Sequence, residues 1–236
     1  MVVVILAGGT GSRLKEKTRQ IPKALIRIGN EPILIHIMRH FAYFGLTRFI
    51  VATGYRAEAF EEAMASFLRQ ESWKVTLVDT GPSTHSGGRL RRLAPWVNGD
   101  TFMMTWCDGL ADLNIRSLLE FHHQHGRLAT LTAVHPPSPF GYLDLDRDRV
   151  VRFCEKRHVR ETWINGAFFV LEPEVLDYIE NDDTPWEEGV LERLARKGDL
   201  MAFRHQGFWH NMDTVSDHSA LAELWQSDRA PWKIWE

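Results

Sequence analysis

The chain has 236 residues, and 28 lysines and arginines against 31 aspartates and glutamates give a net charge of −3. A chain of this length buries about 70% of its unfolded surface, which is enough for one α/β domain over residues 1–236. The near-neutral charge excludes a general attraction to nucleic acid or to a membrane surface, so any anion site has to be local. The two cysteines lack metal-site or redox spacing, and no leader or long apolar run is present, so we expect a cytoplasmic protein.

Residues 2–14, VVVILAGGTGSRL, form the stretch around which the rest of the chain is organised. The apolar run predicts a buried strand, and the glycines after it let the backbone turn with its N–H groups free. Such amides approach phosphate oxygens closely, and Arg13 and Lys23 add donors for the same polyphosphate. The run lacks the third glycine of a dinucleotide fingerprint and the Gly-Lys-Ser/Thr of a P-loop. A connection without a ligand is the alternative.

Helical and strand-like segments then alternate along the chain. Apolar spacing predicts helices over 32–44 and 57–68 and strands over 48–52, 73–78 and 101–107. This order favours a Rossmann-like, mainly parallel or mixed sheet with helices on both faces.

A second glycine-rich segment, DTGPSTHSGGR, follows the strand over 73–78. In open parallel sheets, ligands collect at the carboxyl ends of the strands. We expect this segment to be a loop whose backbone at Ser86, Gly87 and Gly88 lies against a flat base, with Arg89 binding the base carbonyl. A solvent-exposed turn is the alternative.

Two aspartates are candidate ligands for a divalent cation. Asp108 ends a central strand, where a carboxylate is poorly placed for the core and well placed for a metal. Asp213 follows an aromatic and apolar approach and is the expected second ligand. The alternatives are a helix cap or turn for Asp108 and an N-cap of the helix from Ser216 for Asp213. Asp112 is expected to begin the next helix instead.

Three histidines, at positions 122, 123 and 125, resemble a metal cluster. They fall in the last turn of a helix predicted over 114–125, which ends at Gly126. We therefore expect their rings to face solvent there and not to bind a metal.

Residues 140–172 change to short alternating segments, which predict a hairpin-rich region beside the main sheet. Lys156 is a candidate for holding an acceptor phosphate, and Glu155 and Asn165 for binding hydroxyl groups. A surface ion pair is the alternative for the Glu-Lys pair. The tryptophans of the last stretch, Trp225, Trp232 and Trp235, are expected to pack on the domain or to form a subunit contact of a homo-oligomer.

LAGGTGSRL followed by PKAL resembles the signature of the sugar-nucleotide pyrophosphorylases, which join a nucleoside triphosphate to a sugar 1-phosphate. VDTG with SGGRL, and WINGAFF, resemble the glucose-1-phosphate cytidylyltransferase branch. The resemblance covers nearly the whole chain. It implies Mg²⁺ on Asp108 and Asp213, and catalytic roles for Arg13, Lys23 and Lys156. The implied nucleotide-binding residues are Leu6, Ala7, Gly8, Gly9, Thr10, Gly11, Arg13, Lys23, Thr80, Ser86, Gly87, Gly88, Arg89 and Asp108. The implied substrate-binding residues are Gly109, Tyr142, Glu155, Lys156, Asn165, Gly166 and Trp209.

Some positions depart from the pattern of that branch. His85-Ser86 replaces Met-Thr, Arg157 replaces Pro, Pro139 replaces Arg, and an insertion before Trp73 is missing. These departures do not touch the glycine-rich phosphate turn or the two aspartates, on which the evidence for the reaction rests. The departures concern the choice of base, the acceptor and the oligomeric state.

The reaction implied is the transfer of a nucleotide, most readily from CTP, to glucose 1-phosphate, giving CDP-glucose and pyrophosphate. The attacking phosphate is already anionic, so alignment and charge neutralisation suffice without a general base. Residues 1–135 would bind the nucleotide and 136–215 the sugar phosphate, with 216–236 a C-terminal helix and tail. Another nucleotide (UTP or dTTP) or another phosphorylated acceptor is the runner-up, and a non-catalytic sensor would lose the carboxylates. A nicotinamide oxidoreductase is excluded, because Thr53 and Gly54 stand where an acidic residue is needed.

Overall fold

The computed structural model describes residues 1–11, 14, 18, 21–69, 71–136, 142–154 and 162–235. Its centre is a seven-stranded sheet in the order β12-β8-β11-β6-β1-β4-β5. The strands are β1 (Val3–Leu6), β4 (Arg48–Thr53), β5 (Lys74–Asp79), β6 (Phe102–Trp106), β8 (Ala129–Val134), β11 (Ile164–Leu171) and β12 (Leu200–Arg204). β11 runs antiparallel to β6 and β8, and the other neighbours are parallel. The predicted mixed, mainly parallel α/β sheet is confirmed.

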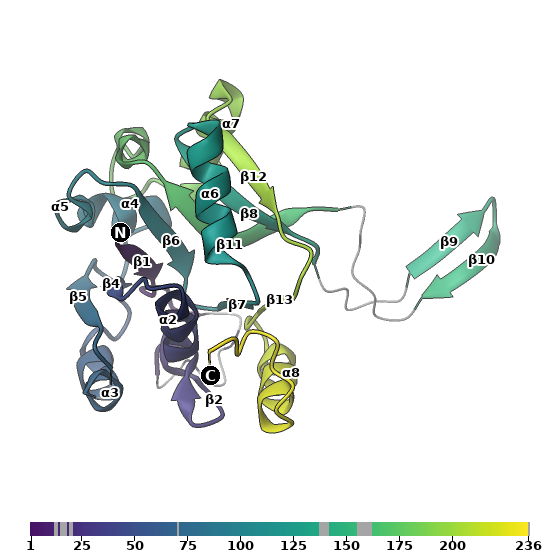
Figure 1. Cartoon of the computed structure of the whole chain (residues 1–236), viewed down its shortest axis with the longest axis horizontal. Helices are drawn as coiled ribbons and strands as arrows, with labels where there is room; N and C mark the ends of the chain where they lie inside the picture. The colour runs from purple at the N-terminus through teal and green to yellow at the C-terminus, as the bar shows by residue number, and fades with distance from the viewer. Residues whose placement is uncertain are drawn as a thin grey trace.

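Helices cover both faces of the sheet, as Figure 1 shows. Side chains alternate along β1, so Val3 and Ile5 join one core cluster while Val4 and Leu6 join the other. The first cluster includes side chains of α2 (Ile33–Tyr43), α3 (Glu58–Leu68) and α6 (Ile115–His125). The second includes side chains of α4 (Ser86–Arg92), α5 (Ala94–Val97) and α7 (Glu192–Lys197), together with the 3₁₀ turn η3 (Pro173–Tyr178) and the π-turn η4 (Trp186–Leu191).

Two short strand pairs lie beside the main sheet. β2 (Arg27–Ile28) pairs with β3 (Glu31–Pro32), and β7 (Gly109–Ala111) pairs with β13 (Trp209–Asn211). The second pair lies at the carboxyl ends of the parallel strands. Because those ends share one edge, they gather the residues that follow β1, β4, β5 and β6.

The caps of two helices decide two of the alternatives left open by the sequence. Asn114 caps α6, since its side chain accepts from the backbone N–H of Ser117 (3.1 Å), so Asp112 does not begin that helix. Thr214 caps α8 (Val215–Gln226) in a capping box with Asp217. The carboxylate of Asp213 is therefore not used as an N-cap.

The C-terminal tryptophans pack onto the domain. Trp232 is fully buried, stacks on Phe208 and Trp225, and donates from Nε1 to Nδ1 of His36 (3.4 Å). Burial lowers the pKa of His36 to about 4, so its ring is neutral and has a nitrogen free to accept. Of the two roles expected of these tryptophans, the structure shows packing on the domain.

His122 corrects one expectation. The sequence predicts that the ring faces solvent, but it is buried, with Nδ1 2.8 Å from Oγ1 of Thr130 and Nε2 2.9 Å from Oε1 of Glu172. The prediction is wrong because β8 and the residue after β11 lie against the last turn of α6. Across the ranges described, no group of three metal-ligating side chains is found, here or elsewhere.

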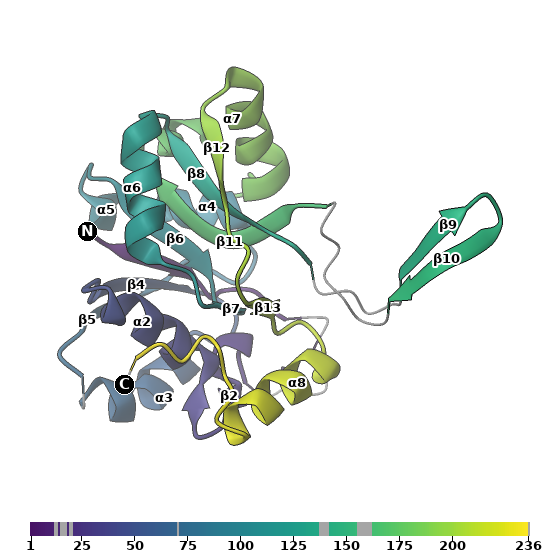
Figure 2. The same cartoon turned by 45° about the vertical axis from the view of Figure 1, so that its right-hand side comes forward.

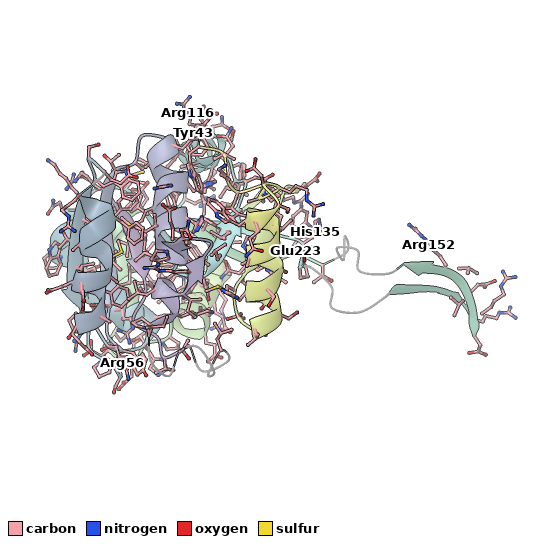
Figure 3. The ribbon with its side chains drawn as sticks, turned by 90° about the horizontal axis from the view of Figure 1, so that it is seen from below. Tyr43, Arg56, Arg116, His135, Arg152 and Glu223 are labelled. Carbon is pink, nitrogen blue, oxygen red and sulfur yellow. The ribbon has the colours of Figure 1, made fainter. Side chains whose placement is uncertain are left out.

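The hairpin formed by β9 (Tyr142–Asp146) and β10 (Arg149–Cys154) stands away from the body in Figures 1 and 2. Figure 3 shows Arg152 on this hairpin, far from the other labelled residues. A hairpin in this region is as predicted. The third alternating segment, however, is β11, which lies inside the main sheet and not beside it. None of the helices described is both long and apolar enough to cross a membrane.

Candidate active site

Two carboxylates and one ammonium meet at the edge of the sheet. Nζ of Lys23 lies 2.6 Å from Oδ2 of Asp108 and 2.6 Å from Oδ1 of Asp213. The exposed fractions of the three side chains are 10%, 21% and 11%, so these contacts form largely out of water. The structure thus brings the two aspartates together, but on the ammonium of Lys23, which the sequence assigned to the triphosphate; their binding of a metal stays a prediction.

The β7–β13 pair brings the two aspartates together. Gly109, directly after Asp108, pairs with Asn211 in the antiparallel ladder, and the N–H of Met212 donates to the carbonyl of Asp108 (2.8 Å). The register fixes how closely the backbones at 108 and 213 approach each other. Two segments about a hundred positions apart are thereby held as one unit.

Further hydrogen bonds orient the Asp213 carboxylate. The side-chain amide of Asn211 donates to Oδ2, while the backbone N–H of Asp213 donates to Asp217 (3.0 Å). The capping box of α8 thus positions the segment that carries Asp213. The sequence analysis did not identify Asn211, whose signal would have been its place two residues before a candidate ligand.

Lys23 and Cys107 are electrostatically coupled to the carboxylates. Burial opposes the charge on Lys23, but attraction to Asp108 and hydrogen bonds to both aspartates outweigh it and raise the pKa of Lys23. Burial, together with the charge of Asp108, raises the pKa of the Cys107 thiol to about 12. The thiol is therefore protonated at neutral pH and is not an activated nucleophile.

Two cavities share the walls formed by Leu6, Gly9 and Trp106. One, of about 210 Å³, also has Gly11, Lys23, Cys107, Asp108 and Asp213 in its lining. The other, of about 320 Å³, extends to Gly8, Thr10, residues 82–86 and Arg89. A ligand across both would reach from the segment after β5 to the carboxylates. Trp106, the last residue of β6, was not predicted as a site residue; its place directly before Cys107 and Asp108 at a strand end is the signal that could have identified it.

Within the glycine-rich turn, the backbone is only partly free. The N–H of Ala7 donates to Ala52 (2.8 Å), and the carbonyl of Gly8 accepts from Tyr55 (3.1 Å). A side chain at Gly8 would collide with the guanidinium of Arg89, whereas nothing lies within 4 Å of the position of a Cβ at Gly9. Gly9 and Thr10 are exposed and present the part of the turn that is open to a ligand.

The second glycine-rich segment corrects part of another expectation, because only residues 80–85 form a loop, whereas its last four residues, Ser86 to Arg89, begin α4. A Cβ at Gly88 would lie 2.6 Å from the Cα of Asp182, and one at Gly87 would lie 2.6 Å from the carbonyl oxygen of Thr184. The N–H of Gly88 donates to that same Thr184 (3.3 Å). These glycines allow close helix packing, and their contact with a base stays a prediction.

Ser86 and Arg89 are also engaged with the protein. Oγ of Ser86 accepts from the N–H of Trp186 (2.9 Å) and donates to Glu187 (3.3 Å). Arg89 is buried and donates from Nη1 to three oxygens, those of Thr53 (3.1 Å), Thr80 (2.6 Å) and Gly81 (2.7 Å). Arg89 thus ties the end of β4 to the segment after β5 while forming one wall of the larger cavity.

On the expected substrate side, a bulge in β11 sets the geometry. The register of β11 against β8 shifts between Asn165 and Phe169. Gly166 accepts from Nε1 of Trp209 (2.8 Å), and Asn165 Oδ1 accepts from the N–H of Ala167 (2.9 Å). Trp209 is buried and joins β13 to the bulge. Arg13, Glu155 and Lys156 lie outside the described residues, as does the side chain of Tyr142.

A family model described as Nucleotidyl transferase matches residues 2–226. The chain belongs to the nucleotidyl transferase family. This membership confirms the resemblance to the sugar-nucleotide pyrophosphorylases that the glycine-rich turn and PKAL suggested.

Curated relatives in this family match along their whole length. The chain is 45% identical over 257 aligned residues to the glucose-1-phosphate cytidylyltransferase of Salmonella typhi, and the alignment covers all of both chains. It is 35% identical over 255 residues to a probable glucose-1-phosphate cytidylyltransferase of Bacillus subtilis (strain 168), again over all of both. The 257 aligned positions exceed the length of this chain, so the Salmonella protein has residues that are missing here.

Solved structures share the fold of this chain. HddC from Yersinia pseudotuberculosis superposes with a TM-score of 0.76 at 22% identity, covering 95% of this chain and 99% of that one. The inositol-1-phosphate CTP transferase from T. maritima gives 0.73 at 18% identity, covering 100% and 98%. At such identities the likeness establishes the fold alone.

Proposed function

We propose that this protein transfers a cytidylyl group from CTP to glucose 1-phosphate, giving CDP-glucose and pyrophosphate. The observation that carries the proposal is the meeting of Lys23, Asp108 and Asp213 in a cavity that begins at the glycine-rich turn. Full-length relatives named glucose-1-phosphate cytidylyltransferase support the choice of CTP and glucose. The same reaction with UTP, dTTP or another phosphorylated acceptor is the second candidate, because several positions depart from the cytidylyltransferase pattern.

The nucleotide would lie along residues 1–135, across the two cavities. Gly9 and Thr10 offer an open turn for the phosphates, and the larger cavity, between residues 82–86 and Trp106, would take the base and ribose. The side chain of Arg13, two positions after Gly11 in the sequence, would add a fork of donors. Thr80, Ser86 and Arg89 would lie around the base in the larger cavity.

Asp108 and Asp213 would hold Mg²⁺. Their two carboxylates are hard oxygen donors of the kind that Mg²⁺ prefers, and their shared contact with one ammonium supports their sharing one metal. When bound, the metal would supply positive charge beside the phosphates of the nucleotide.

The chemistry needs alignment and charge more than proton transfer. An oxygen of the acceptor phosphate forms a bond to the α-phosphorus of CTP, the bond between the α- and β-phosphates breaks, and pyrophosphate leaves with that electron pair. Lys23 and Arg13 would stabilise the charge that develops, and Lys156 would hold the attacking phosphate in line. Cys107 stays a thiol and takes no part as a nucleophile.

The acceptor would lie along residues 136–215. Gly109 and the β11 bulge at Asn165 and Gly166, which Trp209 braces, would line the approach to the carboxylates, and Tyr142, Glu155 and Lys156 complete the predicted set. A homo-oligomer also stays a prediction, which the half-exposed Val150 and Val151 of the β9–β10 hairpin support.

A pyrophosphate-release screen tests the proposal. The four common triphosphates are each combined with phosphorylated sugars and small phosphonates in the presence of magnesium. We expect the highest rate with CTP and glucose 1-phosphate, and none with an Asp108→Asn, Asp213→Asn double variant. A preference for another pair would establish the second candidate, and no pyrophosphate from any pair would reject a nucleotidyltransferase.

A further inference from the structure

The ammonium of Lys23 takes the position between two carboxylates where a divalent cation is expected. We propose that Lys23 competes with the metal for Asp108 and Asp213, and that a bound triphosphate relieves this competition by drawing the ammonium onto its phosphates. The inference rests on the proposed function for the identity of the triphosphate. The competition itself concerns only the three side chains.

The contacts leave no room for both cations on the same oxygens. Nζ is 2.6 Å from one oxygen of each carboxylate, and these are short, charge-assisted hydrogen bonds. Mg²⁺ binds oxygens at about 2.0–2.1 Å, so a metal shared by Asp108 and Asp213 would press against an ammonium held there. Because the group is largely buried, little water screens the repulsion between the two cations.

The other oxygen of Asp213 is not a ready substitute. Oδ2 accepts from the side-chain amide of Asn211, which fixes the rotation of the carboxylate. A metal entering beside Lys23 would have to break that bond or displace the ammonium. Displacement of the ammonium keeps the β7–β13 frame intact, since the lysine comes from η2 (Lys23–Leu25), a separate segment.

A bound nucleotide would bring its phosphates, a second anionic partner for the ammonium of Lys23, into the same cavity. The smaller cavity is lined by Lys23 together with Gly9 and Gly11 of the turn, and the position of a Cβ at Gly11 lies 3.2 Å from Cβ of Lys23. The stem of the lysine thus runs beside the turn that presents amides to phosphates. Four flexible carbons let its head move from the carboxylates to a phosphate without moving the backbone.

This exchange couples the two ligands. With the ammonium on the carboxylates, its positive charge lies between the two aspartates and holds them close together. With the ammonium on the phosphates, the oxygen of each carboxylate that it contacted is released for the metal. Thermodynamic linkage then requires the triphosphate and the metal to strengthen each other's binding to the protein.

The test measures metal binding without nucleotide. Mn²⁺, a paramagnetic substitute for Mg²⁺, is titrated into the full-length protein, and free Mn²⁺ is followed by electron paramagnetic resonance. We expect Lys23→Met to bind Mn²⁺ at least about tenfold more tightly than the wild type. Lys74→Met, a change at an exposed lysine, should leave the affinity at the wild-type value.

Two further variants make the result decisive. Lys23→Gln repeats the test with a polar side chain in case the Met variant unfolds, which circular dichroism reports. Lys23→Met combined with Asp213→Asn should lose the added affinity, because the gain requires both carboxylates. Equal or weaker Mn²⁺ binding by folded Lys23→Met and Lys23→Gln would overturn the inference. Tight Mn²⁺ binding by these variants, together with no pyrophosphate release by the wild-type protein from any substrate pair, would support the competition and reject only the proposed reaction.

Discussion

The two adjoining cavities differ in what their motif residues contact. We call the smaller cavity, with Lys23 and the aspartates, the carboxylate end, and the larger one, with Arg89, the base end. At the carboxylate end, Lys23, Asp108 and Asp213 come from separate segments and turn their charged groups toward one point of a cavity. At the base end, Gly88 packs against the backbone of Asp182, and Arg89 donates its hydrogen bonds to oxygens of the protein. A residue that matches a family motif can therefore serve the ligand directly or hold the wall behind it, and the predictions below separate these roles.

Loss of a carboxylate should have the largest effect. Asp108→Asn or Asp213→Asn should lower kcat by about 10²–10³, or roughly 3–4 kcal/mol of transition-state stabilisation, with the fold retained. Steady-state pyrophosphate release measures this. The matched control is Asp112→Asn, whose carboxylate lies 3.0 Å from Nε2 of His205 and outside the two cavities. Turnover near the wild-type rate in both site variants would remove the assignment.

Adding one methyl group to a glycine should affect the two ends in opposite ways. Gly88→Ala should destabilise the fold by about 1–3 kcal/mol, because the new Cβ meets the backbone of Asp182. Gly9→Ala should leave stability unchanged, since the space there is open, but raise the KM for CTP about tenfold by blocking the turn. Thermal melting and initial rates are both needed. A stable Gly88→Ala, or a Gly9→Ala with unchanged KM, would contradict this contrast.

Arg89→Lys tests whether the base end reads the base. If Arg89 binds the base carbonyl, the ratio of kcat/KM for CTP to that for UTP should change about tenfold, while kcat for CTP changes less. Because three protein oxygens also depend on Nη1, the melting temperature should fall as well.

Arg92→Lys is the matched control for that change. Arg92 pairs with Asp182 and donates to the carbonyl of Thr80 (3.0 Å), and it does not line the larger cavity. It should lower stability without altering base preference. If Arg89→Lys kept the wild-type preference for CTP over UTP but was less stable, Arg89 would support the wall of the cavity without contacting the base.

The sequence predicted what depends on local pattern. Apolar periodicity was sufficient for α2, β4 and α3, and the helical pattern ending at Gly126 was sufficient for α6, although Asn114 and not Asp112 proved to be its cap. The meeting of Asp108 with Asp213 was predictable because both follow apolar segments in motifs of a known family. Their contact with Lys23 through both carboxylates was not, since it depends on the register of β7 with β13.

Long-range packing explains the expectations that failed. Two adjacent glycines disfavour a helix, yet α4 forms because residues 182–184 pack directly against Gly87 and Gly88. His122 is buried because Glu172, fifty positions later, accepts its hydrogen bond. Neither partner is visible in a local window of sequence.

The smallest expected effect concerns Ser86. Its hydroxyl accepts from the N–H of Trp186 and donates to Glu187, so Ser86→Ala should cost about 1 kcal/mol of stability through the unpaired amide at the start of η4. Since the hydroxyl is engaged with η4, the KM for CTP should change less than twofold. Denaturant unfolding and initial rates distinguish the outcomes. Unchanged stability with a raised KM would place the hydroxyl on the ligand, and the base end would then work as directly as the carboxylate end.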